Sequence, residues 1–192
     1  MDQQDVLNIL KKEDISRGLD TIGQIHMLTK HYLLIAEEIS EEGVTFLQPL
    51  KEHRDAYDHM MRVFYLPRRL ENANVPSDFD RDDYIAKNVE KAVGHEYRAF
   101  FDMADWLTFI CRQKIREELS IRRVKQAYTV KYGENEFQNV KELINTVSFE
   151  IAQYRTEKDI GKKEPPLSDV LNYKKMIDRL LEIYQQVMML DT

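Results

Sequence analysis

A polar arc on one predicted helix carries the residues best suited to acid–base chemistry. Asp55 and His59 lie four residues apart in a segment predicted to be helical over residues 48–66, so their side chains are neighbours on the helix surface. A carboxylate in that position can orient the imidazole and prepare it to accept or donate a proton. Arg54 adds a guanidinium suited to binding a phosphate. A solvated helix face with an ordinary i,i+4 ion pair is the alternative interpretation.

Three other polar residues are predicted to face the interior. Glu96 falls in the middle of the apolar stripe of a helix predicted over residues 81–119, while His26 and His53 fall on the apolar sides of two earlier helices. Burying an isolated carboxylate is expensive, so Glu96 must be paired, hydrogen-bonded or protonated. We expect Glu96 to meet His26 or His53 where these helices pack together. Gly94, in the same helix as Glu96, would permit a close helix crossing or mark a kink.

This buried polar group is interpreted either as a structural hydrogen-bonded pair or as a site for a small ligand or a metal ion. The sequence motifs assign neither a metal nor a cofactor. No histidine follows a glutamate by three residues, as in di-iron helical bundles, and the HExxH, GxGxxG, P-loop and GxSxG motifs are missing from the sequence. The one cysteine, Cys111, excludes an intrachain disulfide and a multi-cysteine zinc site. We expect it to be a small buried hydrophobic residue.

The segment from Arg54 to His59 resembles the motif of HEPN ribonucleases, all-α proteins in which one helix carries an arginine, four to six further residues and a histidine. The resemblance implies metal-independent RNA cleavage by a dimer whose two protomers contribute their motifs to a shared cleft. It also implies that Arg54 holds the phosphate, that Asp55 takes the orienting polar position and that His59 is the acid or base. On an ideal helix Arg54 and His59 are about 140° apart, so they would converge only across a dimer or at a distorted turn.

A basic stretch over residues 112–131 is the second feature that favours RNA. Seven lysines and arginines stand there against two glutamates, with tyrosines interleaved that could stack on bases. A solvated helix end with cations near its C-terminus is the alternative interpretation. The predicted RNA-binding residues are Arg112, Arg116, Arg122, Arg123, Lys125 and Tyr128.

Long helices must position all of these residues, because the composition favours few turns. The 192 residues include only 6 glycines and 5 prolines, and 43% hydrophobic with 32% charged residues is a globular composition. Apolar periodicity predicts an all-α, antiparallel helical bundle of about five major helices in a single domain over residues 1–192. The major helices are expected over residues 5–40, 48–66, 81–119, 135–158 and 168–190, with a shorter one over 121–131.

Capping and breaking residues set the predicted boundaries. The first helix is expected to be interrupted near residues 13–18, and Pro67 is expected to end the second. Ser77 or Asp78 would cap the helix that follows, and Ser168 would cap the last one.

Charge and hydropathy limit the partners. A net charge of −6 argues against a general affinity for polyanions, although a local basic patch could still bind RNA. No apolar run approaches the ~20 residues that span a bilayer, and the first residues carry acids where a signal peptide has basic residues. We therefore expect no membrane partner and a cytoplasmic location.

Three functions are compatible with the sequence. The first is a dimeric HEPN-like protein that cleaves or binds RNA. The second, which the sequence favours as a class, is a non-enzymatic helical interaction or accessory protein. It would bind a protein partner or form a homodimer through the apolar surface of a helix such as the last one. The third is a ligand or metal site built from His26, His53 and Glu96.

Overall fold

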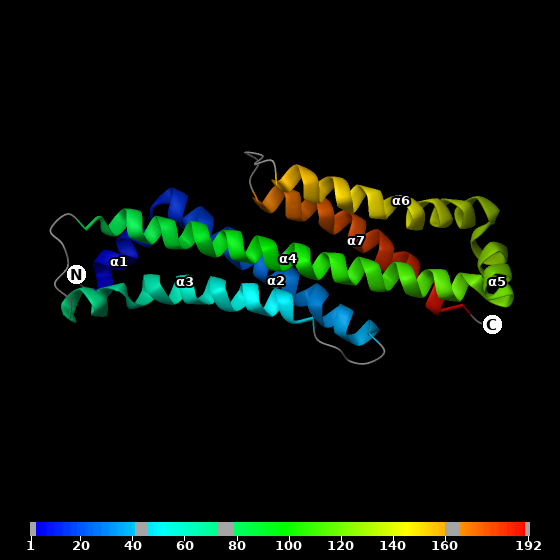
Figure 1. The fold of residues 1–192 in the computed structure, drawn as a ribbon, viewed down its shortest axis with the longest axis horizontal. Coiled ribbons are helices and arrows are strands. Elements are labelled where there is room, and N and C mark those ends of the chain that lie inside the picture. The colour runs from blue at the N-terminus through cyan, green and yellow to red at the C-terminus, as the bar shows by residue number, and fades with distance from the viewer. Residues whose placement is uncertain (1–2, 41–45, 73–78, 160–165, 191–192) are drawn as a thin grey trace. The chain divides into compact units, whose positions relative to one another are not determined.

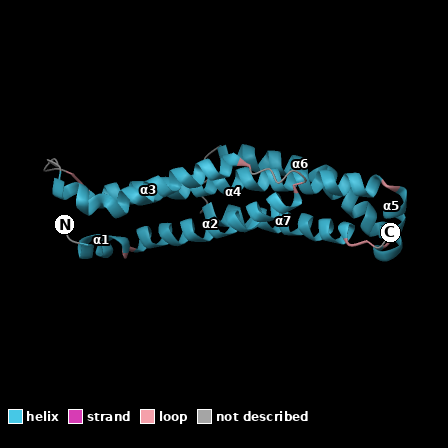
Figure 2. Ribbon diagram, turned by 90° about the horizontal axis from the view of Figure 1, so that it is seen from below, coloured by secondary structure: helices cyan, strands magenta, loops and turns pink. Residues whose placement is uncertain are grey.

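The computed structural model describes residues 3–40, 46–72, 79–159 and 166–190. Within these residues all regular structure is helical, as Figure 2 shows, and no strand is present. The prediction of an all-α helical bundle is therefore confirmed. The helices are α1 (Gln3–Leu10), α2 (Glu13–Ile39), α3 (Leu47–Asn72), α4 (Arg81–Ser120), α5 (Arg122–Tyr132), α6 (Glu134–Asp159) and α7 (Pro166–Met188).

Two compact units divide the chain. The first consists of Met1–Leu34 and Thr45–Met103, and the second of Ile35–Val44 and Ala104–Thr192. Helices α2 and α4 each begin in the first unit and end in the second. The expectation that residues 1–192 form a single domain stays a prediction.

In the first unit, α2, α3 and the first part of α4 form a three-helix bundle. Helix α3 runs antiparallel to α4, because Glu52 pairs with His95 while the later residue His59 pairs with the earlier residue Asn88. Figure 1 shows these two helices side by side. One apolar cluster of this unit joins α2, α3 and α4 through Ile15, Val63, Leu66, Ile85 and Val89.

Helices α2 and α4 run parallel and come close at Gly18. Residue numbers rise together along the two helices, from Gly18 beside Val89 to His26 beside Glu96. A Cβ atom at Gly18 would lie 2.6 Å from Cγ1 of Val89, closer than two carbon atoms pack. The close crossing therefore depends on Gly18 and not on Gly94, whose added Cβ would only touch the flexible side chain of Arg98.

In the second unit, the last part of α4 packs with α6 and α7. Helix α6 is antiparallel to α4, because Arg112 binds Ser148 while Arg116 binds the carbonyl of Ile144. One apolar cluster of this unit consists of Ile115, Val124, Tyr128, Phe137, Val140, Ile144, Ile183 and Val187. The connection from α5 to α6 turns at Gly133, whose φ of 93° is favourable for glycine.

Most predicted helix boundaries agree with the structure, and the exceptions have local causes. The first interruption lies at Lys11 and Lys12, just before the expected residues 13–18. Helix α3 continues through Pro67 to residue 72, because a proline removes one amide donor while the amides that follow it can still bond. Helix α7 begins at Pro166, which suits a first turn, so Ser168 lies inside the helix and is not its cap.

The N-terminus of α4 is capped by a residue that the sequence analysis missed. The Asp80 side chain accepts hydrogen bonds from the backbone N–H groups of Asp82 and Asp83, at 3.0 and 3.1 Å. The expected caps, Ser77 and Asp78, lie outside the described residues.

We predict that Gly18→Ala lowers the free energy of unfolding by about 1–3 kcal/mol, because the new methyl group forces α2 away from Val89. Gly23→Ala is the matched control, since a Cβ at that position of α2 meets nothing within 4 Å. The control should gain up to about 1 kcal/mol from the better helix propensity of alanine. Urea denaturation, monitored by circular dichroism, measures the free energy of unfolding of both variants. Equal effects of the two substitutions would contradict the close crossing at Gly18.

Candidate functional site: a histidine and glutamate cluster

Two mirrored dipeptides bring carboxylates and imidazoles together in the first unit. Helix α3 carries Glu52-His53, and α4 carries His95-Glu96. Because the two helices are antiparallel, each glutamate meets the histidine of the other helix. The shortest nitrogen–oxygen distances are 2.8 Å for His95 and Glu52 and 2.9 Å for His53 and Glu96.

The inner pair gains a third member from α2. The carboxylate of Glu96 is only 3% exposed, and its Oε1 lies 3.2 Å from Nδ1 of His26. The rings of His26 and His53 also meet edge to face, with their centroids 4.6 Å apart. The expected encounter of Glu96 with His26 or His53 is thus found with both histidines. We call these three residues the Glu96 cluster.

Charge interactions decide the protonation of this cluster. Burial works to raise the pKa of Glu96, but the imidazoles of His26 and His53 outweigh burial and hold that pKa below its ordinary value. In return, Glu96 raises the pKa of His26. The carboxylate therefore stays ionised inside the bundle, with its charge balanced by its neighbours.

One contact in the Glu96 cluster is close without being a hydrogen bond. Nδ1 of His53 and Oε2 of Glu96 are 2.9 Å apart, but the imidazole and carboxylate lack the alignment that a hydrogen bond requires. Both ring nitrogens of His53 and Oε2 of Glu96 are buried and have no hydrogen-bond partner among the described residues. The contact is therefore electrostatic, and these atoms keep unused bonding capacity.

The outer pair belongs to a separate polar network. Oε2 of Glu52 accepts hydrogen bonds from His95 at 2.8 Å and from Nε of Arg98 at 2.9 Å. Burial works to raise the pKa of Glu52, but these two donors outweigh it and lower the pKa. Arg98 also lies 2.7 Å from Nδ1 of His95, whose ring stacks on His59 with centroids 5.3 Å apart.

The predicted acid–base pair of Asp55 and His59 is not formed. Oδ1 of Asp55 accepts two hydrogen bonds from Arg54, at 2.8 and 3.0 Å, and this guanidinium lowers the pKa of Asp55. His59 turns inward instead, where its Nδ1 lies 2.9 Å from Oδ1 of the buried Asn88 on α4. Each side chain has another partner, because Asp55 is held by the neighbouring Arg54 and His59 reaches across to α4.

The predicted RNA-binding residues separate into engaged and exposed ones. Tyr128 is fully buried and donates a hydrogen bond to Gln186, so the expectation that it stacks on bases is wrong in this structure. Arg112 donates to Thr108 and Ser148, and Arg116 donates to the carbonyl of Ile144. Three predicted residues stay exposed on α5, namely Arg122, Arg123 and Lys125.

The chemistry open to the Glu96 cluster follows from its donor atoms. His26, His53 and Glu96 each offer one ligand atom, and these atoms all lie within 4.8 Å of one another. Two imidazoles and one carboxylate could hold a metal ion. Elsewhere, the expectation of a buried Cys111 is confirmed, and burial raises the pKa of its thiol to about 12.

Comparisons with protein-family models, curated proteins and solved structures find no match to this chain. Among the described residues, no helix combines the length and apolar character that crossing a bilayer requires.

We predict that Glu96→Gln, measured in the presence of a chelator, lowers the free energy of unfolding by about 1–3 kcal/mol, because it removes the charge that His26 and His53 surround. Glu90→Gln is the control, since Glu90 is exposed on the same helix. It should change stability by no more than about 0.5 kcal/mol. Similar losses for both variants in urea denaturation would contradict a special role for the buried carboxylate.

Proposed function

We propose that this chain is a helical interaction protein and that the outer face of α3 binds a second copy of the chain. The observation that carries the proposal is a stripe of apolar side chains on α3, each between 40% and 67% exposed. Exposed apolar surface that runs continuously along a helix marks an interaction site. This outer stripe of α3 consists of Leu47, Leu50, Tyr57, Met61 and Phe64.

The spacing of the outer stripe favours a helix as the partner. Its members are three, four or seven residues apart and occupy a and d positions of a heptad repeat, with Arg54 at the remaining a position. The expected interaction surface on the last helix is less suitable, because the stripe of α7 is buried in the core. That buried stripe consists of Val170, Tyr173, Ile177, Leu180, Ile183 and Val187.

Arg54 decides the direction of the pairing. A parallel pair of α3 helices would place Arg54 opposite Arg54 of the second copy, and two like charges would meet in an apolar seam. An antiparallel pair instead places Arg54 opposite Tyr57 of the second copy, where the guanidinium can lie over the ring. In the same register Leu47 faces Phe64, and Leu50 faces Met61. The stripe is therefore complementary to itself about a twofold axis.

The charges beside the outer stripe fit the same register. Lys51 and Asp58 occupy e positions, and the antiparallel pairing brings Lys51 of one copy toward Asp58 of the other. Asp58 already pairs with Arg62 on its own helix, but an exposed pair of this kind contributes little. Opposite charges on either side of the middle of the seam support a second copy as the occupant.

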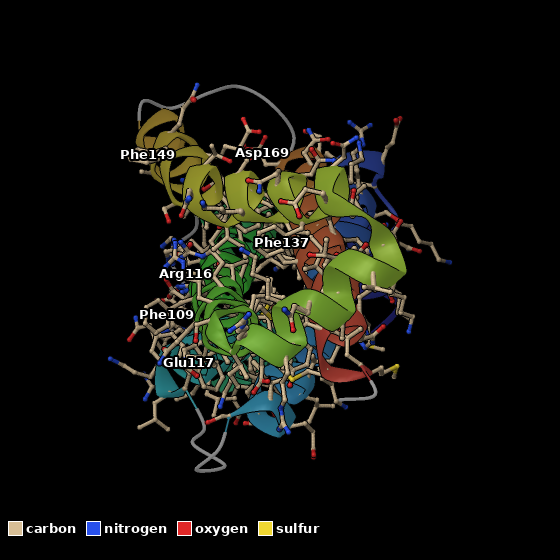
Figure 3. The ribbon with its side chains drawn as sticks, turned by 90° about the vertical axis from the view of Figure 1, so that its right-hand side faces the viewer. Phe109, Arg116, Glu117, Phe137, Phe149 and Asp169 are labelled. Carbon is tan, nitrogen blue, oxygen red and sulfur yellow. The ribbon has the colours of Figure 1, made fainter. Side chains whose placement is uncertain are left out.

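We predict that Tyr57→Glu weakens self-association about tenfold or more, because it buries a carboxylate in the seam. Phe149→Glu is the control, since Phe149 is 78% exposed on α6 (Figure 3) and is not part of the outer stripe. Analytical ultracentrifugation across a range of concentrations measures both. A wild-type chain that stays monomeric at every concentration would overturn the proposal, and so would a control that dissociates equally.

A charge exchange tests the antiparallel register itself. Lys51→Asp and Asp58→Lys should each weaken the dimer, because each places like charges across the seam. The double variant should restore much of the lost affinity, since it reverses both partners. Failure of the double variant to recover would contradict this register.

RNA binding or metal-independent RNA cleavage is a second proposal, and two observations support it. The side chain of Arg54 is 70% exposed, and the proposed dimer would place both copies of Arg54 beside its twofold axis. Arg122, Arg123 and Lys125 present further exposed cations on α5. Cleavage would also require His59 to leave Asn88, which now lies beside its Nδ1.

We predict for this second function that the wild-type chain cleaves RNA in the presence of a chelator and that Arg54→Ala and His59→Ala each abolish the cleavage. All three proteins are compared at matched folding and oligomeric state on single-stranded and structured RNAs. Cleavage that persists in both variants would exclude these residues as its source. An inactive wild-type chain would leave the interaction function alone.

A further inference from the structure

We infer that His26, His53 and Glu96 together bind one divalent transition-metal ion of the zinc class. The outer stripe of α3 does not include these residues, so the inference goes beyond the proposed function. Each ligand comes from a different helix, namely α2, α3 and α4. A bound ion would therefore cross-link the three-helix bundle of the first unit.

The distances suit a small ion. The two carboxylate oxygens of Glu96 lie 3.2 and 2.9 Å from the nearest nitrogens of His26 and His53. Zinc binds imidazole nitrogen and carboxylate oxygen at about 2.0–2.2 Å, which places the ligand atoms of a tetrahedral site about 3.3 Å apart. Small side-chain rotations would thus bring these atoms to a common centre.

The unused bonding capacity of the cluster points to the same conclusion. His53 has two buried ring nitrogens without a hydrogen-bond partner, and Oε2 of the 3% exposed Glu96 also has none among the described residues. Buried polar atoms are normally satisfied, and each one left unpaired costs about 1–3 kcal/mol. Nδ1 of His53 approaches Oε2 without the alignment of a hydrogen bond. A metal ion would accept lone pairs from both atoms.

The donor set selects the kind of ion. Imidazole suits zinc and other late divalent transition metals, whereas calcium and magnesium prefer sites made entirely of oxygen ligands. Three protein ligands leave the fourth position of a tetrahedral ion for water or another small ligand. The side chain of His26 is 44% exposed, so the ion could enter and exchange from that side.

The test is metal binding by the full chain after removal of bound metal with a chelator. Isothermal titration with Zn²⁺ should give one equivalent per chain, and Co²⁺ should give the visible absorption spectrum of a four-coordinate ion. Mg²⁺ should not bind at this site. The thermal midpoint of unfolding should rise on addition of Zn²⁺, because the ion binds the folded state only.

Variants separate this site from incidental binding. His26→Gln, His53→Gln and Glu96→Gln should each weaken Zn²⁺ binding roughly 100-fold or more, because even residues that only orient ligands contribute 10–100-fold. His31→Gln is the control, since His31 is an exposed histidine on the same helix as His26. If Glu96→Gln fails to fold, the half-exposed His26 keeps the test decisive.

Three outcomes would overturn the inference. The first is that the wild-type chain binds no zinc at all. The second is that zinc binding survives the replacement of all three ligands, and the third is that zinc binding is lost in the His31→Gln control. Lys51→Asp should bind zinc as tightly as the wild-type chain, because Lys51 is exposed on the other side of α3 from His53 and is not one of the ligands. The metal test and the dimer test can therefore fail independently.

Discussion

The buried carboxylate of Glu96 is the constraint on which the first unit depends. Its charge is balanced by His26 on α2 and His53 on α3, so the three long helices must all be in register at one level. Sliding any of them by one turn, about 5.4 Å, would leave an ionised group buried without a partner. Apolar contacts tolerate such shifts far better, because they are not directional. Gly18 fixes a second point along the α2–α4 pair, since the lack of a Cβ atom there lets the backbone of α2 approach Val89 closely.

The same cluster sets the rotation of α3 about its own axis. With His59 turned toward Asn88, and with His53 held against Glu96 at the edge of the outer stripe, the side chains on the side of α3 opposite His59 must face solvent. Tyr57 and Phe64 lie on that side, so their exposure follows from the polar interior rather than from a lack of apolar partners in the chain. The outer stripe is thus held on a helix whose orientation is already determined. A surface fixed in advance loses less entropy when a partner binds.

The fold was largely predictable from the sequence, and the site was only partly so. Long apolar stripes define most helices to within a few residues, and the position of Glu96 on its stripe predicts an encounter with a histidine. The partner of His59 was not predictable, because periodicity says which face a residue occupies but not which side chain lies opposite. Tyr128 was misassigned for a related reason, since a tyrosine among exposed cations can still point into the core. The mirrored dipeptides at residues 52–53 and 95–96 could have predicted both glutamate–histidine pairs, because the two helices that carry them were expected to be antiparallel.

The orientation of α3 also bears on the chemistry that the Arg54–His59 motif could support. Arg54 is directed outward into the proposed seam, whereas His59 is half-buried beside Asn88. A reaction that uses both groups from one copy would need α3 to rotate, and that rotation would withdraw His53 from the buried charge of Glu96. The energetic cost of exposing that charge to an apolar interior opposes the movement. Binding through the outer stripe needs no such rotation, and neither does a metal ion at the Glu96 cluster. Both roles use α3 in its present orientation, which favours binding over cleavage for this helix.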